Sequence, residues 1–317
     1  MRILVLGAGG IGGYFGARIH AAGSDVTFLV RPARAAQLRE NGLKVFSPFG
    51  DLQIAPKVLT RDTLNESFEV VILSCKAYDL DSAMDAIAPA VGERSVILPL
   101  LNGVRHIDTL TARFGTAHVL GGVAFISVML AANGEIRHLN KRHGFVTGAL
   151  TTPPSPWLPP LAALLAASGI EFTLADNIEQ AMWDKVVFLA TLAGSTCLMR
   201  ASIGDILNTL TGPDYITGLL TECAETAATC GHPVAAAQLV TYREQLSEPG
   251  SVLMASMLRD VERGGETEAD HILGDLVSRA QTKGVATPLL RLAYSHLQAY
   301  AARRKASIDS CAGAMMS

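Results

Sequence analysis

Three glycines near the start of the chain, Gly7, Gly9 and Gly12, have the spacing G-x-G-x-x-G. They directly follow an apolar run, residues 1–6, that is typical of a buried parallel strand. A helical pattern and a second apolar run, residues 26–30, come next. In such a unit the glycines permit a tight turn, a close approach to phosphate and close helix–strand packing, while the helix N-terminus attracts the phosphate charge. The predicted dinucleotide-binding turn consists of Gly7, Ala8, Gly9, Gly10, Ile11 and Gly12.

The residue after the second strand indicates which dinucleotide binds. An NAD site usually has Asp or Glu at this point, where the carboxylate accepts hydrogen bonds from the ribose hydroxyls. This chain has Arg31 there, and Asp25 lies at the opposite end of the strand. A planar, permanently charged guanidinium suits the 2′-phosphate of NADP(H), which is therefore the predicted cofactor. A glycine turn without a ligand and an Arg31 that only faces water are the alternatives.

Strand and helix patterns alternate through the first half of the chain. Strand-like runs at residues 69–75 and 95–98 follow the first two strands, with helical patterns at 35–41 and 80–90. A small hairpin is expected over residues 43–46 and 52–54. This alternation predicts a doubly wound parallel sheet, which binds ligands beyond the carboxyl ends of its strands. Arg31, Lys76 and Asn102 all follow strands, so we expect them in the same crevice as the glycine turn.

Residues 119–147 are strand-like and predict an antiparallel addition to this sheet, with Asn133 and Gly134 as a hairpin turn. A helix at 161–168 and a strand at 171–174 complete the first domain. The remaining patterns are helical, over residues 178–199, 215–230, 235–246, 251–262, 267–283 (with Thr267 as N-cap) and 288–305. The predicted organisation is a sheet domain over residues 1–176, a helical domain over 177–305 and a frayed tail over 306–317.

Composition restricts the function classes. The chain has 317 residues, 49% of them hydrophobic, and a net charge of −3, so it is a globular protein without a nucleic-acid-binding surface. No apolar stretch of membrane-spanning length is free of Gly, Pro and charge, and Met1 leads straight into the first strand, so we expect a cytoplasmic protein without a signal peptide. The five cysteines and eight histidines lack metal-site spacing, and no metal is predicted. The apolar helix at 178–199 fits a monomer or a homodimer.

Beyond these patterns, a set of short motifs resembles the ketopantoate reductases (2-dehydropantoate 2-reductases). The motifs occur in the family's order and spacing at residues 7–12, 31, 74–77, 101–104, 183–185, 256–260 and 265–268. The resemblance extends over roughly residues 1–300. It implies an α/β Rossmann-like NADP-binding domain, followed by an all-α domain similar to the C-terminal domain of 6-phosphogluconate dehydrogenase.

The resemblance also implies a catalytic lysine. Lys185 matches the family's lysine that protonates the carbonyl oxygen as the cofactor delivers hydride. An ammonium group can stabilise and then protonate the alkoxide, and burial would lower its pKa toward neutrality. Lys185 lies in the apolar run 181–187, where a charged side chain is unusual and indicates a specific role. A lysine beside Asp184 that extends its amine into water is the alternative.

Further site residues are implied in the same way. Asn102 matches a contact to the cofactor and the lysine, and Lys76 matches a second basic residue near the NADP phosphate. Glu268 matches a carboxylate near the nicotinamide ribose and the substrate hydroxyl. Ser256 matches a substrate-binding serine, and Asp260 lies one helical turn further on. Considered without the resemblance, Asn102 would be a turn residue, Lys76 a solvated lysine and Glu268 a glutamate favoured by the helix dipole.

This chain departs from the family in the region that would contact the substrate. The lysine helix of the family usually carries asparagines four and eight residues after the lysine, where this chain has Leu189 and Ala193. Leu101 replaces the usual Gln before Asn-Gly, while Ser195 and Thr196 offer hydroxyls further along the helix. A small polar 2-oxo acid would lose hydrogen bonds at about 1 kcal/mol each in such a pocket.

The sequence therefore favours an NADPH-dependent oxidoreductase that binds a small 2-oxo acid between its two domains. Ketopantoate is the substrate implied by the resemblance and would place the enzyme in pantothenate biosynthesis. A relative acting on a more apolar keto or hydroxy acid is the second hypothesis, favoured by Leu189 and Ala193. A non-catalytic NADP-binding sensor is the third, although a sensor has no use for the proton donor that Lys185 would provide.

Overall fold

The computed structural model describes residues 1–315, and the chain divides into two compact units. The first unit contains Met1–Asn102 and His106–Met182, and the second contains Gly103–Arg105 and the described chain from Trp183 onward. The predicted boundary at residue 176 precedes helix α6 (Ile178–Met199), whose first residues group with the first unit. The short segment Gly103–Arg105 groups with the helical unit although it follows the last strand of the first sheet.

The first sheet has five parallel strands in the order β5-β2-β1-β6-β7. The strands are β1 (Arg2–Leu6), β2 (Asp25–Leu29), β5 (Lys57–Leu59), β6 (Val70–Leu73) and β7 (Val96–Pro99). Ile3 and Val5 belong to one hydrophobic core and Leu4 belongs to another, so both faces of the sheet are buried. Burial on both faces explains why the strands read as continuous apolar runs. The predicted parallel sheet is confirmed, although β5 is too short to produce a recognisable pattern.

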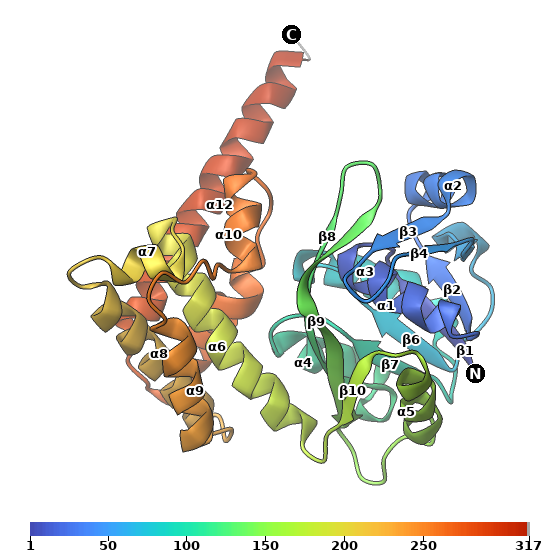
Figure 1. Ribbon diagram of the computed structural model, residues 1–317, viewed down its shortest axis with the longest axis horizontal. Helices are drawn as coiled ribbons and strands as arrows, with labels where there is room; N and C mark the ends of the chain where they lie inside the picture. The colour runs from blue at the N-terminus through green and yellow to red at the C-terminus, as the bar shows by residue number, and fades with distance from the viewer. Residues whose placement is uncertain (316–317) are drawn as a thin grey trace. The chain divides into compact units, whose positions relative to one another are not determined.

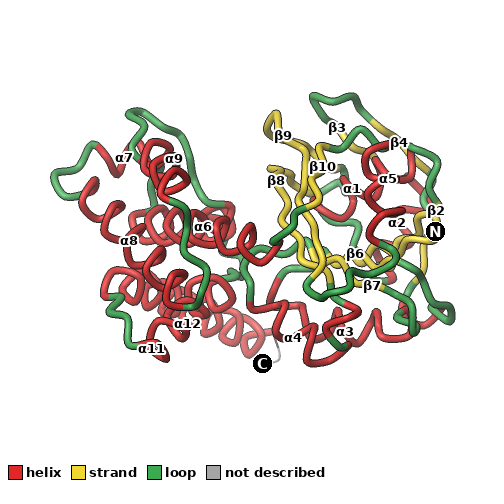
Figure 2. Tube along the Cα trace, turned by 90° about the horizontal axis from the view of Figure 1, so that it is seen from below, coloured by secondary structure: helices red, strands yellow, loops and turns green. Residues whose placement is uncertain are grey.

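Helices cover both faces of this sheet, as Figure 2 shows for β6 and β7 with α3 and α4 on one side and α1 and α5 on the other. The helices are α1 (Gly10–Ala21), α2 (Pro32–Asn41), α3 (Leu80–Ile87), α4 (Arg105–Phe114) and α5 (Leu158–Ala167). Short 3-10 turns are η1 (Arg61–Thr63), η2 (Ala77–Asp79), η3 (Ala88–Ala90) and η4 (Thr116–His118). Tyr14 and Phe15 of α1 pack with Ile3, whereas Leu80 of α3 and Leu110 of α4 pack with Leu4.

The strand-like stretch after residue 119 forms a second sheet. Strands β8 (Leu120–Leu130) and β9 (Ile136–Ala149) make an antiparallel hairpin, as predicted, with Gly134 at a φ of +85° in the turn. The hairpin does not extend the first sheet, so that part of the prediction is wrong. Instead β9 pairs with β3 (Leu43–Phe46) and with β10 (Glu171–Leu174), and β3 pairs with β4 (Leu52–Ile54). Ile136 and Phe145 of β9 pack with Phe15 of α1 in one core cluster, which explains why the hairpin lies over α1.

The second unit is helical throughout its regular structure (Figure 1). Besides α6 it contains α7 (Ile203–Leu207), α8 (Gly212–Thr229), α9 (Ala236–Leu246), α10 (Ser256–Glu262), a π-helical turn (Asp270–Gly274), α11 (Asp275–Lys283) and α12 (Pro288–Met315). By length and composition α6 could cross a membrane, but 67% of its most apolar window is buried inside the protein. Such burial is typical of the central helix of a folded domain.

The last helix is longer than the sequence predicted. Helix α12 runs from Pro288 to Met315, so residues 306–315 are helical and not a frayed tail, and residues 316–317 lie outside the described part. Its final turns extend beyond the rest of the unit in Figure 1. No Gly or Pro interrupts residues 306–310, so the helix can continue past the predicted end at residue 305.

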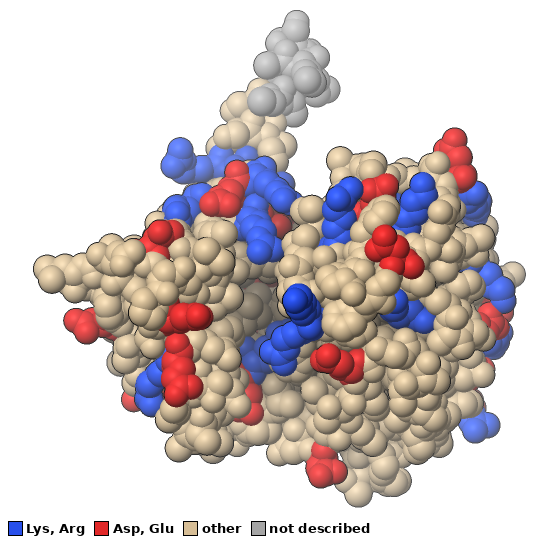
Figure 3. All heavy atoms as spheres, in the orientation of Figure 1, with Lys and Arg blue, Asp and Glu red and all other residues tan. Residues whose placement is uncertain are grey.

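Charged side chains of both signs are interspersed over the face shown in Figure 3. Part of the basic cluster that follows residue 302 packs against its own unit. Arg304 donates a hydrogen bond to Gly264 O at 2.9 Å, and its guanidinium lies 3.9 Å from the Glu266 carboxylate. The arrangement is that of a solvated helix surface with local ion pairs.

Candidate active site

The carboxyl ends of four parallel strands lie side by side and define one edge of the first sheet. Leu6 at the end of β1 pairs with both Leu29 and Leu73, and Leu73 pairs in turn with Pro99. The predicted cofactor residues that follow these ends are Gly7, Arg31, Lys76 and Asn102. Strand register therefore brings them to a single edge, which is where parallel sheets bind their ligands.

The glycine turn is shaped by close backbone packing. Gly7 has a φ of +91°, and its N–H donates to Leu29 O at 2.9 Å. A Cβ on Gly12 would lie 2.1 Å from Ser74 Oγ and 2.6 Å from Gly7 O, so no other residue fits at that position. Ser74 in turn donates to Leu6 O at 2.9 Å, which ties the end of β6 to β1 beside the turn. Both glycines are therefore structural requirements of the turn itself.

Gly9 differs from these two glycines because its surroundings are open. No described atom lies within 4 Å of the position that a Cβ on Gly9 would take. Gly9 is the N-cap of α1, and no side chain among the described residues caps that helix. The first backbone N–H groups of the helix are thus available to an anion, which the helix dipole also favours. The turn fits a pyrophosphate, with the backbone from Gly9 to Gly12 as the group that would hold it.

Arg31 forms an ion pair that the sequence did not reveal. Its Nη2 donates to Asp79 Oδ1 at 3.0 Å, although the Arg31 side chain is 80% exposed. Asp79 ends the η2 turn, which Lys76 begins as its N-cap. The pair thus connects the end of β2 with the turn after β6. The sequence offered one signal for this ion pair, namely that the acidic Asp79 follows Lys76 by three positions.

Arg34 is a second guanidinium at this edge and was not among the predicted site residues. Its Nη2 donates to Ala8 O of the glycine turn at 3.0 Å and to Gly134 O of the β8–β9 hairpin at 2.9 Å. Burial lowers the pKa of Arg34, and none of the described carboxylates pairs with it. Arg34 therefore fixes the glycine turn against the hairpin and adds positive charge near it. Its contact with Gly134 is a non-local one that sequence spacing does not show.

Lys185 and Glu268 interact within the helical unit. Lys185 lies on α6 among the buried residues Trp183, Val186 and Val187. Burial lowers the pKa of Lys185 to about 8, while the Glu268 carboxylate, itself only 8% exposed, raises it. This direction is the one expected for a lysine in the apolar run 181–187, although the residue as a whole keeps intermediate solvent exposure. Such a group can exchange a proton near neutral pH.

Lys185 shares its face of α6 with apolar side chains. Leu189 follows one turn later and is half-buried, and Ala193 follows after a second turn with no exposed surface. Ser195 is fully buried, and its Oγ has no hydrogen-bond partner among the described residues. Thr196 uses its hydroxyl to donate to Leu192 O at 2.7 Å. The Thr196 hydroxyl proton is thus used within α6, whereas the Ser195 hydroxyl has no such partner among the described residues.

Helix α10 carries Ser256 and Asp260 and begins beside the end of α6. Ala255 N donates to Thr196 Oγ1 at 3.4 Å, and Thr196 lies three turns after Lys185. Ser256 is exposed at the first turn of α10, and Asp260 is half-buried one turn later. The start of α10 therefore packs against the C-terminal part of α6, the helix that carries Lys185.

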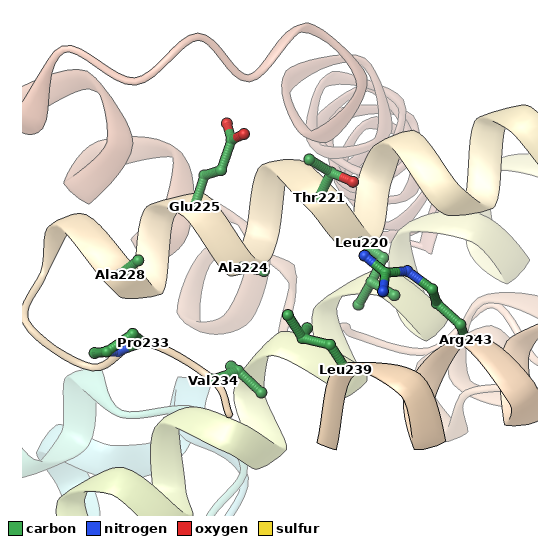
Figure 4. A pocket seen from close by; sticks show the side chains of 9 residues that line it. All are labelled: Leu220, Thr221, Ala224, Glu225, Ala228, Pro233, Val234, Leu239 and Arg243. Atoms are coloured by element: carbon green, nitrogen blue, oxygen red, sulfur yellow. The ribbon is translucent and has the colours of Figure 1, made fainter. Parts of the chain in front are cut away.

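A cavity of about 240 Å³ in the helical unit lies between α8 and α9 (Figure 4). Its lining residues are Leu220, Thr221, Ala224, Glu225, Ala228, Pro233, Val234, Leu239 and Arg243. None of the predicted site residues lines it, so the cavity is separate from the Lys185–Glu268 pair. Within residues 1–315 no group of three or more His, Cys, Asp or Glu side chains is placed to hold a metal ion.

A doubly wound sheet with an open glycine turn, joined to a helical unit with a desolvated lysine, defines a dinucleotide-dependent oxidoreductase that acts on CH–OH groups. Comparison with known proteins identifies the family. Residues 3–151 match the family described as ketopantoate reductase PanE/ApbA, and residues 177–301 match its C-terminal domain. The chain belongs to the ketopantoate reductase family, as the sequence motifs suggested.

Individual relatives agree with this assignment. The chain is 36% identical over 304 residues to an uncharacterised oxidoreductase, YkpB, of Bacillus subtilis, covering 96% of this chain and all of the relative. The crystal structure of 2-dehydropantoate 2-reductase from Methylococcus capsulatus superimposes with a TM-score of 0.85 at 26% identity, covering 96% of this chain and 98% of the other.

A D-mandelate dehydrogenase, solved with NADH and anilino(oxo)acetate, has the same fold. Its TM-score is 0.86 at 21% identity, over 96% of this chain and 100% of the other. At that identity the likeness establishes the fold alone. The Rossmann-like sheet domain and the all-α second domain predicted from the sequence are thus confirmed.

Proposed function

We propose that the protein reduces a small 2-oxo acid to the 2-hydroxy acid with NADPH, and that 2-dehydropantoate is the first substrate to test. The observation that carries the proposal is the Lys185–Glu268 pair, because a lysine with a pKa of about 8 is an effective proton donor at physiological pH. Membership of the ketopantoate reductase family supports the reaction class.

The chemistry assigned to the chain's own residues is a proton transfer. When bound, NADPH supplies a hydride to the carbonyl carbon of the substrate. The electron pair of the C=O bond then moves to the oxygen, and the Lys185 ammonium gives that oxygen a proton. The neutral amine regains a proton from solvent. In this proposal Glu268 keeps Lys185 protonated by its charge and contacts the substrate hydroxyl, and Asn102 contacts the cofactor.

We propose that Arg31 and Lys76 bind the 2′-phosphate of NADPH. Arg31 is exposed, and its ion pair within residues 1–315 is with Asp79; a surface ion pair contributes about 0–1 kcal/mol. A dianionic phosphate can therefore compete for the guanidinium and form a stronger, bidentate contact. The glycine turn, Gly7 to Gly12, would hold the pyrophosphate. Comparing the dissociation constants of NADPH and NADH tests this part of the proposal.

A more apolar substrate is the second candidate, and the face of α6 favours it. Leu189 and the fully buried Ala193 follow Lys185 on α6, and Leu101 is buried at the end of the first sheet. A substrate group near Leu189 and Ala193 would be received by methyl groups, which favours branched or aromatic 2-oxo acids over ketopantoate with its hydroxyl. The fold shared with D-mandelate dehydrogenase is compatible with that substrate class. Ser256 and Asp260 are the polar groups that we assign to the substrate.

The deciding experiment is to follow NADPH oxidation with a panel of 2-oxo acids, including ketopantoate, phenylglyoxylate and a branched aliphatic acid, with Lys185→Ala as the control. Turnover of ketopantoate with the highest kcat/KM would assign the protein to pantothenate biosynthesis. A preference for phenylglyoxylate would support the apolar alternative. Tight NADPH binding without turnover of any acid would contradict both and indicate a sensor.

We also propose that the enzyme works in the cytoplasm. The cysteines that support this are Cys75, Cys197, Cys223 and Cys230, none of which forms a disulfide within the described residues. Free thiols are typical of a reducing compartment. Fractionation of cells that express the tagged protein would check the compartment.

A further inference from the structure

The chain after Glu268 forms a π-helical turn where the sequence predicted a regular helix capped by Thr267. The helix begins at Ala269, and residues Asp270–Gly274 are π-helical before α11 (Asp275–Lys283) continues. Glu268 O accepts from His271 N at 3.1 Å and from Ile272 N at 3.0 Å. A π-helical turn contains one residue more than an α-helical turn and often marks a functional position. The extra residue rotates Glu268 by about 100° relative to α11.

Tyr294 of α12 contacts the first and last residues of this π-helical turn. Its Oη donates to Asp270 Oδ1 at 2.8 Å. At the other end of the turn, a Cβ on Gly274 would lie 2.8 Å from both Cζ and Oη of Tyr294. Because Gly274 lacks that Cβ, the tyrosine ring can lie directly against the backbone. The π-helical turn is therefore held by α12 at two points.

Gly103 permits His271 of the turn to lie directly against its backbone. Gly103 has a φ of +91°, and a Cβ there would lie 2.7 Å from His271 Cδ2 and 3.4 Å from His271 O. His271 is only 8% exposed, so its ring cannot move away freely. Gly103 directly follows Asn102 in the chain and groups with the helical unit. Contacts of the π-helical turn thus involve two elements distant in sequence.

We propose that Tyr294 and His271 are positioning residues, which hold the π-helical turn so that Glu268 faces Lys185. Glu268 lies two residues before the first residue of the turn and is buried, so its direction is set by the backbone that follows it. A regular α-helix over the same residues would direct the carboxylate elsewhere. The inference rests on the proposed function in one respect, because the reacting roles of Lys185 and Glu268 come from it.

The test measures the ionisation of Lys185 without turnover. The rate at which acetic anhydride modifies Lys185 is followed from pH 6 to 10 by mass spectrometry of the peptide. Glu268 is the charged group that raises the pKa of Lys185, so Glu268→Gln should lower the midpoint. Tyr294→Phe, which removes the hydrogen bond to Asp270, should lower it by about half a pH unit or more. The double variant should show no further shift beyond Glu268→Gln.

Matched controls separate positioning from general loosening of the unit. Tyr215 on α8 also uses its Oη, donating to Gly194 O at 3.4 Å, so Tyr215→Phe should leave the midpoint unchanged. Gly274→Ala forces Tyr294 away and should reproduce the shift. Gly218→Ala on α8 is the matched control: its Cβ would lie at the same distance, 2.8 Å, from Leu289 Cδ1, and it should leave the midpoint unchanged.

The inference is overturned if folded Tyr294→Phe and Gly274→Ala keep the wild-type midpoint. It is also overturned if the Tyr294→Phe shift adds in full to that of Glu268→Gln. If none of the tested 2-oxo acids supports NADPH oxidation by the wild-type protein, the proposed function fails. The midpoints of Lys185 acetylation in the variants still decide whether Tyr294 has a positioning role.

Discussion

The two halves of the molecule position their proposed functional residues by different physical principles. At the sheet edge the backbone does most of the positioning, because the strand register and the close packing at Gly7 and Gly12 fix the path of the glycine turn. In the helical unit side-chain packing does most of the positioning, because Glu268 is buried, the Lys185 amine is desolvated and their interaction depends on how the helices pack. The first half is therefore sensitive to added volume, and the second half is sensitive to charge and to pH.

The largest effect is expected from removing the charge in the helical half. Lys185→Ala should lower kcat by roughly 100-fold or more, which is the usual loss with a general acid, and leave the dissociation constant of NADPH nearly unchanged. Steady-state kinetics and cofactor titration would measure the two effects. Lys283→Ala, an exposed lysine at the end of α11, is the matched control. A wild-type kcat in Lys185→Ala would show that the proton comes from another group.

At the sheet edge, Arg31→Asp should weaken NADPH binding by about 10- to 100-fold, because a charged hydrogen bond of about 1.5–3 kcal/mol becomes a repulsion. NADH lacks the 2′-phosphate and should bind within a few-fold of wild type. Arg39→Asp serves as the control. Arg39 lies in the last turn of α2, the helix that begins after Arg31, and its replacement changes the net charge by the same amount. Equal losses for both dinucleotides would remove the 2′-phosphate role of Arg31.

Replacement of two glycines in the same turn should affect different properties, stability for Gly12 and dinucleotide affinity for Gly9. Gly12→Ala should destabilise the fold by about 1–3 kcal/mol, because its Cβ would lie 2.1 Å from Ser74 Oγ and 2.6 Å from Gly7 O. Gly9→Ala has open space, so its stability should stay within about 0.5 kcal/mol of wild type, while dinucleotide affinity falls. Urea unfolding and cofactor titration would compare them. A Gly9→Ala protein with normal affinity would mean that no phosphate lies against this turn.

The pH dependence of activity should reflect the pKa of Lys185. Reduction needs the protonated amine, so its kcat should be level below pH 8 and fall about tenfold per pH unit above it. Oxidation of the 2-hydroxy acid needs the neutral amine and should rise through the same range. Initial rates in both directions would be measured from pH 6 to 10. A reduction rate that stays level to pH 10 would contradict the assignment.

The smallest effect is expected at a buried histidine of the first unit. His143 stacks on Phe49, its Nδ1 lies 3.0 Å from Tyr14 Oη, and burial lowers its pKa below 6.5. The unfolded chain therefore takes up a proton first, and stability should decrease by roughly 1 kcal/mol or less as pH falls from 7 to 5.5. In His143→Gln this part of the decrease should disappear from urea unfolding curves. An identical pH dependence in the variant would exclude His143 as its source.

How much could be predicted follows the same division between the two halves. Local spacing was sufficient for the parallel sheet, the glycine turn, the helix Ile178–Met199 and the turn at Gly134. It was not sufficient for the second sheet, because whether β9 pairs with β3 depends on residues ninety positions apart. The roles of Ser74 and Arg34 at the turn were likewise invisible, since their contacts with Gly12 and Ala8 are non-local.

The sequence alone determined where a dinucleotide turn must form, because glycine spacing and strand patterns act over neighbouring residues. It also marked Lys185 as unusual, since a lysine within an apolar run is exposed to desolvation when the chain folds. Only the tertiary structure decided that Glu268 acts on that lysine and that a π-helical turn packed against Tyr294 and Gly103 precedes α11. Those features depend on the packing of helices far apart in the chain, and packing free energy is a property of the assembled core and not of any one segment.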